Sequence, residues 1–271
     1  MARTRAPVSI FGLLVGCLVA ASGCTEVSAR RGIQEGNKLY YEGKYDEAIK
    51  VYDEALQKQP ALAIGWFNLG LAHLALFAPG AKTPENEKHA QGAIDALCNR
   101  YIKLVPADTQ ATDYCLSTYI DSGHYEGAIE YFEKKLAVNP TDLEAVAQLA
   151  NINTQAGKID EAIKWHKKRA EMVTSVDAKA DSYYSVGVLD WKRLYQHIEV
   201  VGLDRLKIAD EGIASLQLAD KIRGSHAPTL SYINLLYRER ALANGASYAR
   251  VVDTATAMSY MKRATEVAKK Q

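Results

Sequence analysis

The sequence lacks the motifs by which common enzyme classes hold a phosphate, a metal or an activated nucleophile. It contains no Gly-rich phosphate loop, no His-Glu-x-x-His and no Gly-x-Ser-x-Gly. Its six histidines share no spacing that is typical of metal ligands. We therefore expect a protein that is not an enzyme, with no catalytic residues, no bound metal and no cofactor.

An excess of charge of either sign is also absent. The chain has 33 Lys and Arg residues against 32 Asp and Glu, a net charge of +1. Such a balance gives no electrostatic reason to expect nucleic acid as a partner. The chain is 48% hydrophobic and 24% charged over 271 residues, which is typical of a globular protein with a sizeable core.

Residues 1–23 have the pattern of a signal peptide. Arg3 and Arg5 form a positively charged start, and residues 8–21 form an apolar stretch that is too short for an ordinary membrane span. Small residues come directly before Cys24, as they do before the bond that a signal peptidase cuts. We expect this segment to be removed from the mature protein.

The stretch Ala21-Ser22-Gly23-Cys24 resembles a bacterial lipobox. That resemblance implies that the Cys24 thiol is lipidated and that residues 24–28 tether the fold to a membrane. Thr25 follows the cysteine, which in lipoproteins of double-membrane bacteria implies the periplasmic side of the outer membrane. Cys17 offers a weaker partial match. Plain secretion, with Cys24 as an incidental thiol, is the alternative.

A short phrase recurs along the mature chain. Its three copies are Gly-Lys-Tyr-Asp-Glu-Ala-Ile at 43–49, Gly-His-Tyr-Glu-Gly-Ala-Ile at 123–129 and Gly-Lys-Ile-Asp-Glu-Ala-Ile at 157–163. The last two start 34 residues apart, which is the length of a helical-hairpin repeat. The glycine permits a tight turn, the acidic residue favours a helix start, and the alanine lets two helices approach closely. The phrase therefore predicts stacked helix–turn–helix units.

These features resemble the tetratricopeptide repeat (TPR). Trp66-Phe67-Asn68-Leu69-Gly70 is similar to the start of the TPR consensus, and Pro60 and Pro140 end their units. The resemblance implies an all-α TPR solenoid over residues 29–271, in about six repeats with insertions near 76–88 and 196–202. The expected repeats are about 29–62, 63–106, 109–142, 143–176, 180–224 and 229–271.

The C-terminal repeats resemble those of bacterial envelope TPR lipoproteins. The relevant stretches are Gly187-Val188-Leu189-Asp190-Trp191 and residues 232–240. The chain is most similar to the TPR lipoproteins of the gliding-motility machinery in myxobacteria. This implies an outer-membrane-anchored scaffold in an envelope complex. The alternatives are a pilotin or assembly factor for outer-membrane secretin or barrel proteins, and an adaptor of periplasmic cell-wall enzymes.

The resemblance also implies where partners bind. A TPR superhelix turns its first helices toward a concave face, and exposed aromatic side chains there suit other envelope proteins as partners. When the predicted repeats are aligned with the TPR consensus, Ile33 and Ile233 lie on the first helices and face this concave groove. The principal candidates are Tyr40, Phe67, Leu71, Tyr184, Trp191 and Tyr237. The alternative is that some of these residues belong to the core or are covered by the insertion at 76–88.

Two cysteines remain within the repeats. Cys98 falls in the second helix of repeat two and Cys115 in the first helix of repeat three, and such helices pack together in a TPR solenoid. An oxidising compartment permits a disulfide between them, provided that their Cα atoms lie within about 7 Å. The alternative is a pair of buried thiols that act as small apolar side chains.

The lipobox resemblance leads to a first prediction. Cys24→Ser removes the thiol that would carry the lipid, so the variant should leave the membrane fraction or keep its leader uncleaved. Cell fractionation and the mass of the N-terminal peptide measure both effects. A variant that is processed and fractionates like the wild type would contradict lipidation at Cys24.

Overall fold

The computed structural model describes residues 11–270, with side chains from residue 25 onward. The predicted leader and its Cys24 side chain therefore lie outside the described part, apart from the backbone after residue 10. All regular structure in the described residues is helical, with no β-strand, so the all-α prediction is confirmed. Among the same residues, we find no helix with both the length and the apolarity that crossing a membrane requires.

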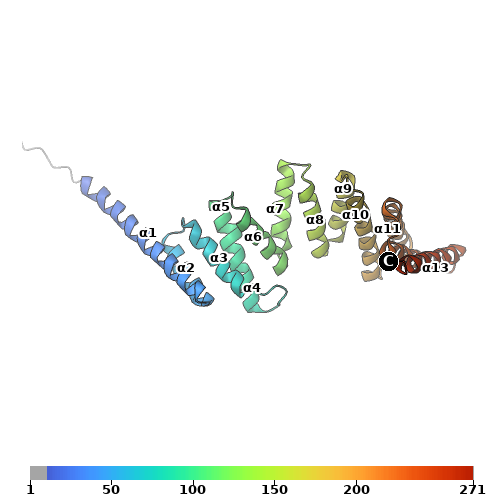
Figure 1. Ribbon diagram of the computed structural model, residues 1–271, viewed down its shortest axis with the longest axis horizontal. Helices are drawn as coiled ribbons and strands as arrows, with labels where there is room; N and C mark the ends of the chain where they lie inside the picture. The colour runs from blue at the N-terminus through green and yellow to red at the C-terminus, as the bar shows by residue number, and fades with distance from the viewer. Residues whose placement is uncertain (1–10, 271) are drawn as a thin grey trace, which may run out of the picture. The chain divides into compact units, whose positions relative to one another are not determined.

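The chain divides into two compact units, of which the first ends at His124. In this unit α1 packs on α2, α2 on α3, α3 on α4 and η1, and η1 on α6 (Figure 1). Segments α4, η1 and α5 follow one another without a break, and η1 is a stretch of π-helix. The helices are α1 (Phe11–Tyr41), α2 (Tyr45–Lys58), α3 (Ala63–Leu76), α4 (Pro84–Ala93), η1 (Ile94–Tyr101), α5 (Ile102–Leu104) and α6 (Thr109–Ser122).

The second unit begins at Tyr125 and has the same sequential packing. Each helix from α7 to α13 packs on the next, and α10 also contacts α12. Its helices are α7 (Tyr125–Val138), α8 (Leu143–Gln155), α9 (Ile159–Met172), α10 (Val176–Gln196), α11 (Gly202–Arg223), α12 (Ala227–Ala243) and α13 (Tyr248–Ala268). The helical hairpins follow the predicted repeats, and the two helices of repeat three fall in different units.

The recurring phrase has the structure that its residues predict. Gly43, at the turn between α1 and α2, adopts a φ of 76°, in the left-handed region that glycine reaches without strain. The alanines of the three copies, Ala48, Ala128 and Ala162, are fully buried. Asp46 and Glu47 lie in the first turn of α2, where the helix dipole favours negative charge. One local phrase therefore specifies the turn, the helix start and the close helix contact.

The first insertion is shorter than predicted. Residues 77–83 form the loop, whereas residues 84–88, which the sequence analysis placed in it, form the start of α4. Pro84 begins the helix instead of breaking it, because a proline in the first turn has no N–H that the helix would need. The Thr83 hydroxyl caps this turn by accepting a hydrogen bond from the Asn86 N–H at 3.2 Å.

Two further expectations concern the ends of helices. The second insertion lies where it was predicted, as a loop of residues 197–201 between α10 and α11. Residues 25–28, which belong to the predicted tether, are part of the continuous helix α1. A helix rises only about 1.5 Å per residue, so these residues add a short rigid extension and not a flexible linker.

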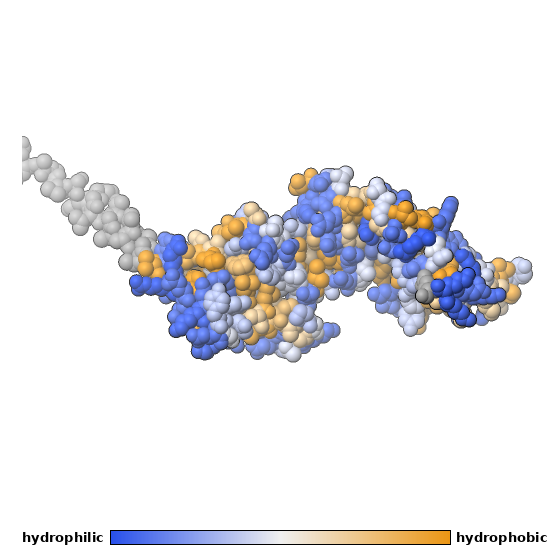
Figure 2. Space-filling model, viewed as in Figure 1, coloured by the Kyte–Doolittle hydropathy of each residue, from blue (hydrophilic) through white to orange (hydrophobic). Residues whose placement is uncertain are grey.

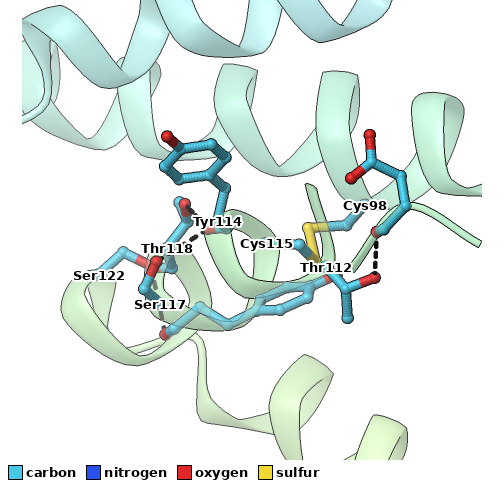
Figure 3. Close-up of a disulfide and its surroundings, with 9 residues drawn as sticks. Cys98, Thr112, Tyr114, Cys115, Ser117, Thr118 and Ser122 are labelled. Carbon is cyan, nitrogen blue, oxygen red and sulfur yellow. Dashed lines mark hydrogen bonds between the residues drawn. A yellow bond between two sulfur atoms is a disulfide. The ribbon is translucent and has the colours of Figure 1, made fainter. Parts of the chain in front are cut away.

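A disulfide joins Cys98 on η1 to Cys115 on α6, and the two Cα atoms are 5.4 Å apart (Figure 3). Close by, the Tyr101 hydroxyl donates a hydrogen bond to Asp108 at 2.7 Å, and Asp108 caps α6 by accepting from the Ala111 N–H. Thr118 donates to the backbone carbonyl of Tyr114 at 2.6 Å within α6. Repeats two and three are thus joined covalently and by hydrogen bonds.

This bridge predicts a measurable contribution to stability. It closes a loop of 17 residues in sequence, and a loop of that size restricts the unfolded chain enough to be worth about 3 kcal/mol. Replacing both Cys98 and Cys115 by Ala should lower the free energy of unfolding by about that amount in denaturant titrations. Reductant should destabilise the wild type and leave the double variant unchanged. Two thiols open to alkylation in the oxidised, unfolded protein would contradict the bridge.

Candidate protein-interaction surfaces

The first unit contains a surface pocket of about 240 Å³ formed by α1, α2 and α3. Two of the predicted groove residues, Tyr40 and Leu71, line it. The full lining is Asn37, Tyr40, Tyr41, Tyr52, Ile64, Asn68 and Leu71. The pocket therefore combines aromatic and aliphatic walls with two side-chain amides.

Hydrogen bonds fix the polar part of this pocket. The Asn37 Oδ1 atom accepts from the Tyr52 hydroxyl at 2.7 Å and from the Asn68 Nδ2 atom at 2.7 Å. Burial raises the pKa of Tyr52 to about 12, so its hydroxyl stays protonated and donates. One asparagine thereby connects α1, α2 and α3, and both amides are held in defined orientations.

The rim of the pocket exposes large side chains. Tyr41 is 86% exposed and Ile64 is 54% exposed. The Tyr40 ring packs edge-on against Tyr41 at 5.9 Å and against Tyr45 at 5.2 Å. Rigid aromatic side chains of this kind supply much of the binding energy at protein interfaces. Figure 2 shows apolar residues among hydrophilic ones on the surface of the chain.

Phe67 and Ile33 both pack against other residues of the first unit. Phe67 is half-buried, with its ring 5.1 Å from that of Tyr101 and 6.4 Å from that of Tyr114. Ile33 is only 5% exposed and belongs to the core. A Cβ atom on Gly65 would lie 2.7 Å from the end of Ile33, so Ile33 fills the space that this glycine leaves. Ile33 as a groove residue was therefore wrong.

The predicted groove residues of the second unit are half-buried aromatic contacts between helices. Tyr184 and Trp191 of α10 both meet Tyr232 of α12, at 5.8 and 5.3 Å between ring centres. Tyr237 of α12 stacks on Tyr260 of α13 at 5.7 Å. All five pack against one buried cluster: Leu194, Ala209, Ile213, Leu216, Ile233 and Leu236. Ile233 is fully buried, so its prediction as a groove residue was wrong.

Two ion pairs hold the arginine that packs on Tyr237. The Arg240 guanidinium lies 4.7 Å from the Tyr237 ring centre and binds Asp253 at 2.5 Å and Asp210 at 2.8 Å. These two carboxylates raise the pKa of Arg240, so its charge is permanent. The face of α12 near Tyr237 is therefore rigid, and Tyr237 contributes to the fold whether or not a partner also touches it.

Asp190, beside Trp191, is a buried carboxyl whose Oδ2 atom has no hydrogen-bond partner within the described residues. Burial raises its pKa to about 7, against the opposing effect of Arg193 and Lys167. The folded state therefore binds this proton more tightly than the unfolded state does. The contribution of protonated Asp190 to the free energy of unfolding is therefore fully present below the ordinary pKa of a carboxyl group, and it is lost as the pH rises through about 7.

The structure also brings together residues that no motif connects. Asp46 of α2 lies beside Glu85 and His89 of α4, and one ligand atom from each falls within 4.8 Å of the others. His89 contacts a second buried histidine, His73 of α3, with 3.2 Å between the two Nδ1 atoms. Because its members come from two repeats, this group has no motif by which the sequence alone could reveal it.

The aromatic contacts of α10 lead to a prediction about stability. Tyr184→Ala removes packing against Tyr232 and the core, so we expect the free energy of unfolding to fall by about 2 kcal/mol. Tyr41→Ala serves as the matched control, because Tyr41 is exposed and its loss should cost less than about 0.5 kcal/mol. Chemical denaturation of the two variants measures both values. Equal stabilities would show that Tyr184 is not a structural contact.

Comparison with known proteins supports the repeat assignment. A family model described as "TPR repeat" matches residues 36–76, and one described as "Tetratricopeptide repeat" matches residues 119–168. A TPR repeat-containing protein of Methanocaldococcus jannaschii is 28% identical over 148 residues. That alignment covers 55% of this chain and only 24% of the relative.

Solved structures of TPR proteins are also similar. The C-terminal part of a TPR repeat-containing protein from Cytophaga hutchinsonii is 14% identical, with a TM-score of 0.47 and coverage of 88% of this chain and 80% of that one. YrrB, described as a TPR protein with an unusual peptide-binding site, is 18% identical, with a TM-score of 0.39 and coverage of 73% and 88%. With the family matches and the observed helical hairpins, the chain carries tetratricopeptide repeats and its fold is a TPR solenoid.

Proposed function

We propose that this protein is a non-enzymatic scaffold that binds an extended segment of a partner protein at the pocket of the first unit. The observation that carries the proposal is the combination of an exposed aromatic rim, at Tyr41, with the fixed amides of Asn37 and Asn68. Side-chain amides both donate and accept hydrogen bonds, so they match the backbone of an extended peptide. TPR proteins are in general interaction scaffolds, which agrees with this use of the surface.

We further propose that Cys24 anchors the protein to the periplasmic side of the outer membrane. The lipobox-like stretch before Cys24 supports this. Helix α1 is continuous from residue 25 to Tyr41, and a helix of that length spans about 26 Å. The pocket at the end of α1 would then be held within reach of membrane proteins and of their periplasmic segments.

The assembly that we propose for this scaffold is a gliding-motility complex. The support is the similarity of the repeats around Trp191 and Tyr237 to those of the envelope lipoproteins of that machinery. A pilotin or assembly factor would instead bind a secretin or barrel protein, and an adaptor would bind a cell-wall enzyme. The identity of the partner that co-purifies with the wild-type protein distinguishes these three functions.

The test of the pocket uses two exposed tyrosines. Tyr41→Ala removes the aromatic rim of the pocket, so a partner that co-purifies with the wild type from native membranes should be recovered about tenfold less, since loss of an aromatic anchor costs about 1.4 kcal/mol or more. Tyr248→Ala is the control, because Tyr248 is 82% exposed and lies on α13 in the other unit. Quantitative mass spectrometry of the purified complexes measures the recovery.

One result would contradict binding at this pocket. Equal partner recovery with Tyr41→Ala and with the wild type would place the binding surface elsewhere. Circular dichroism of both variants checks that neither change alters the helical content.

A further inference from the structure

We propose that the first unit binds one divalent transition-metal ion, of the class of Zn²⁺, between the start of α2 and the start of α4. The ligands are the carboxylates of Asp46 and Glu85 and the Nε2 atom of His89. This inference concerns residues outside the pocket described above, and it does not depend on the proposed function.

The spacing of these atoms suits a small cation. All three ligand atoms lie within 4.8 Å of one another, and His89 Nε2 is 3.5 Å from Glu85 Oε1. A tetrahedral ion with bonds of about 2.1 Å holds its ligand atoms about 3.4 Å apart. Asp46 and Glu85 are exposed, so they can turn toward the ion by the remaining distance without disturbing the core. Three protein ligands leave a fourth position for water or for a ligand from a partner.

His89 distinguishes this group from ordinary surface carboxylates. It is only 3% exposed, yet its Nε2 atom lies 3.5 Å from the exposed carboxylate of Glu85. Its Nδ1 atom lies 3.2 Å from Nδ1 of His73, so one of these two nitrogens carries the hydrogen of the bond. When His89 is the donor, its Nε2 atom presents a lone pair to the carboxylates, an arrangement that a cation between them stabilises. Histidines that bind metals usually donate their second ring nitrogen in this way.

The neighbouring residues hold the two histidines rigidly. A Cβ atom on Gly92 would lie 2.4 Å from the His73 ring, so the glycine makes room for that ring between α3 and α4. Asn86 fixes the insertion that leads into α4. Its side chain accepts from the Ala78 N–H at 2.7 Å and donates to the carbonyl oxygens of Ala78 and Ala81 at 2.9 and 2.8 Å. The first turn of α4, which carries Glu85, is thereby held in place, and His89 follows one turn later on the same helix.

The donor set favours one class of metal. An imidazole nitrogen together with carboxylates suits Zn²⁺ and related ions, whereas Mg²⁺ and Ca²⁺ prefer oxygen ligands alone. Bound there, the ion would link the second helix of repeat one to the second helix of repeat two. It would stabilise the same irregular repeat that carries the disulfide.

The experiment uses the purified full chain, stripped of metal with a chelator. Calorimetric titration with Zn²⁺ should give one ion per chain. Glu85→Gln and Asp46→Asn each remove one ligand charge at an exposed position, so each should weaken Zn²⁺ binding about tenfold or more. Glu47→Gln, which removes a neighbouring exposed carboxylate outside the group, should bind Zn²⁺ like the wild type. Excess Mg²⁺ should leave Zn²⁺ binding unchanged.

Three results would overturn the proposal. These are no stoichiometric binding of Zn²⁺ to the wild type, equal affinity in the wild type and in both ligand variants, or displacement of Zn²⁺ by Mg²⁺. Because the ligand substitutions lie on the surface, unchanged circular dichroism separates loss of binding from loss of folding. The partner co-purification described above is a separate readout, so failure of one proposal leaves the other standing.

Discussion

Close approach of neighbouring helices is the constraint on which the rest of this structure depends. At three helix crossings a glycine faces a leucine of the next helix, and an added Cβ atom would lie 2.3 to 2.7 Å from it. These pairs are Gly70 with Leu97, Gly187 with Leu216 and Gly212 with Leu236. Since real Cβ atoms do not approach so closely, a side chain at any of these glycines would force the facing leucine or its helix to move.

Local sequence was enough to predict the helical hairpins, because the turn glycine, the first-turn acid and the buried alanine act over a few residues. The repeat pattern also placed Cys98 and Cys115 on adjacent packed helices, which permits a disulfide, but it left two buried thiols as an equal alternative that only the Cα distance could decide. The groove was harder to predict. The repeat pattern predicts which way a side chain points but not how much a neighbouring residue covers it, and both Ile33 and Ile233 are buried.

The same reasoning explains why the Asp46, Glu85 and His89 group left no motif in the sequence. Glu85 and His89 are four residues apart on one helix, but Asp46 is contributed by the preceding repeat. The insertion in repeat two gave a partial signal. It was visible from its prolines, yet the sequence did not reveal that Pro84 starts α4 or that Asn86 anchors the loop. Repeat two thus departs from the regular pattern where it gains the anchored loop, the histidine pair and the disulfide.

The central claim is that the pocket beside Tyr41 is where this scaffold holds its partner. Placing a photo-crosslinking amino acid at position 41, and separately at position 248, tests it most directly in intact cells. The account predicts that one defined protein becomes covalently attached at position 41 and not at position 248. No crosslink at position 41, or the same attached protein at both positions, would contradict it.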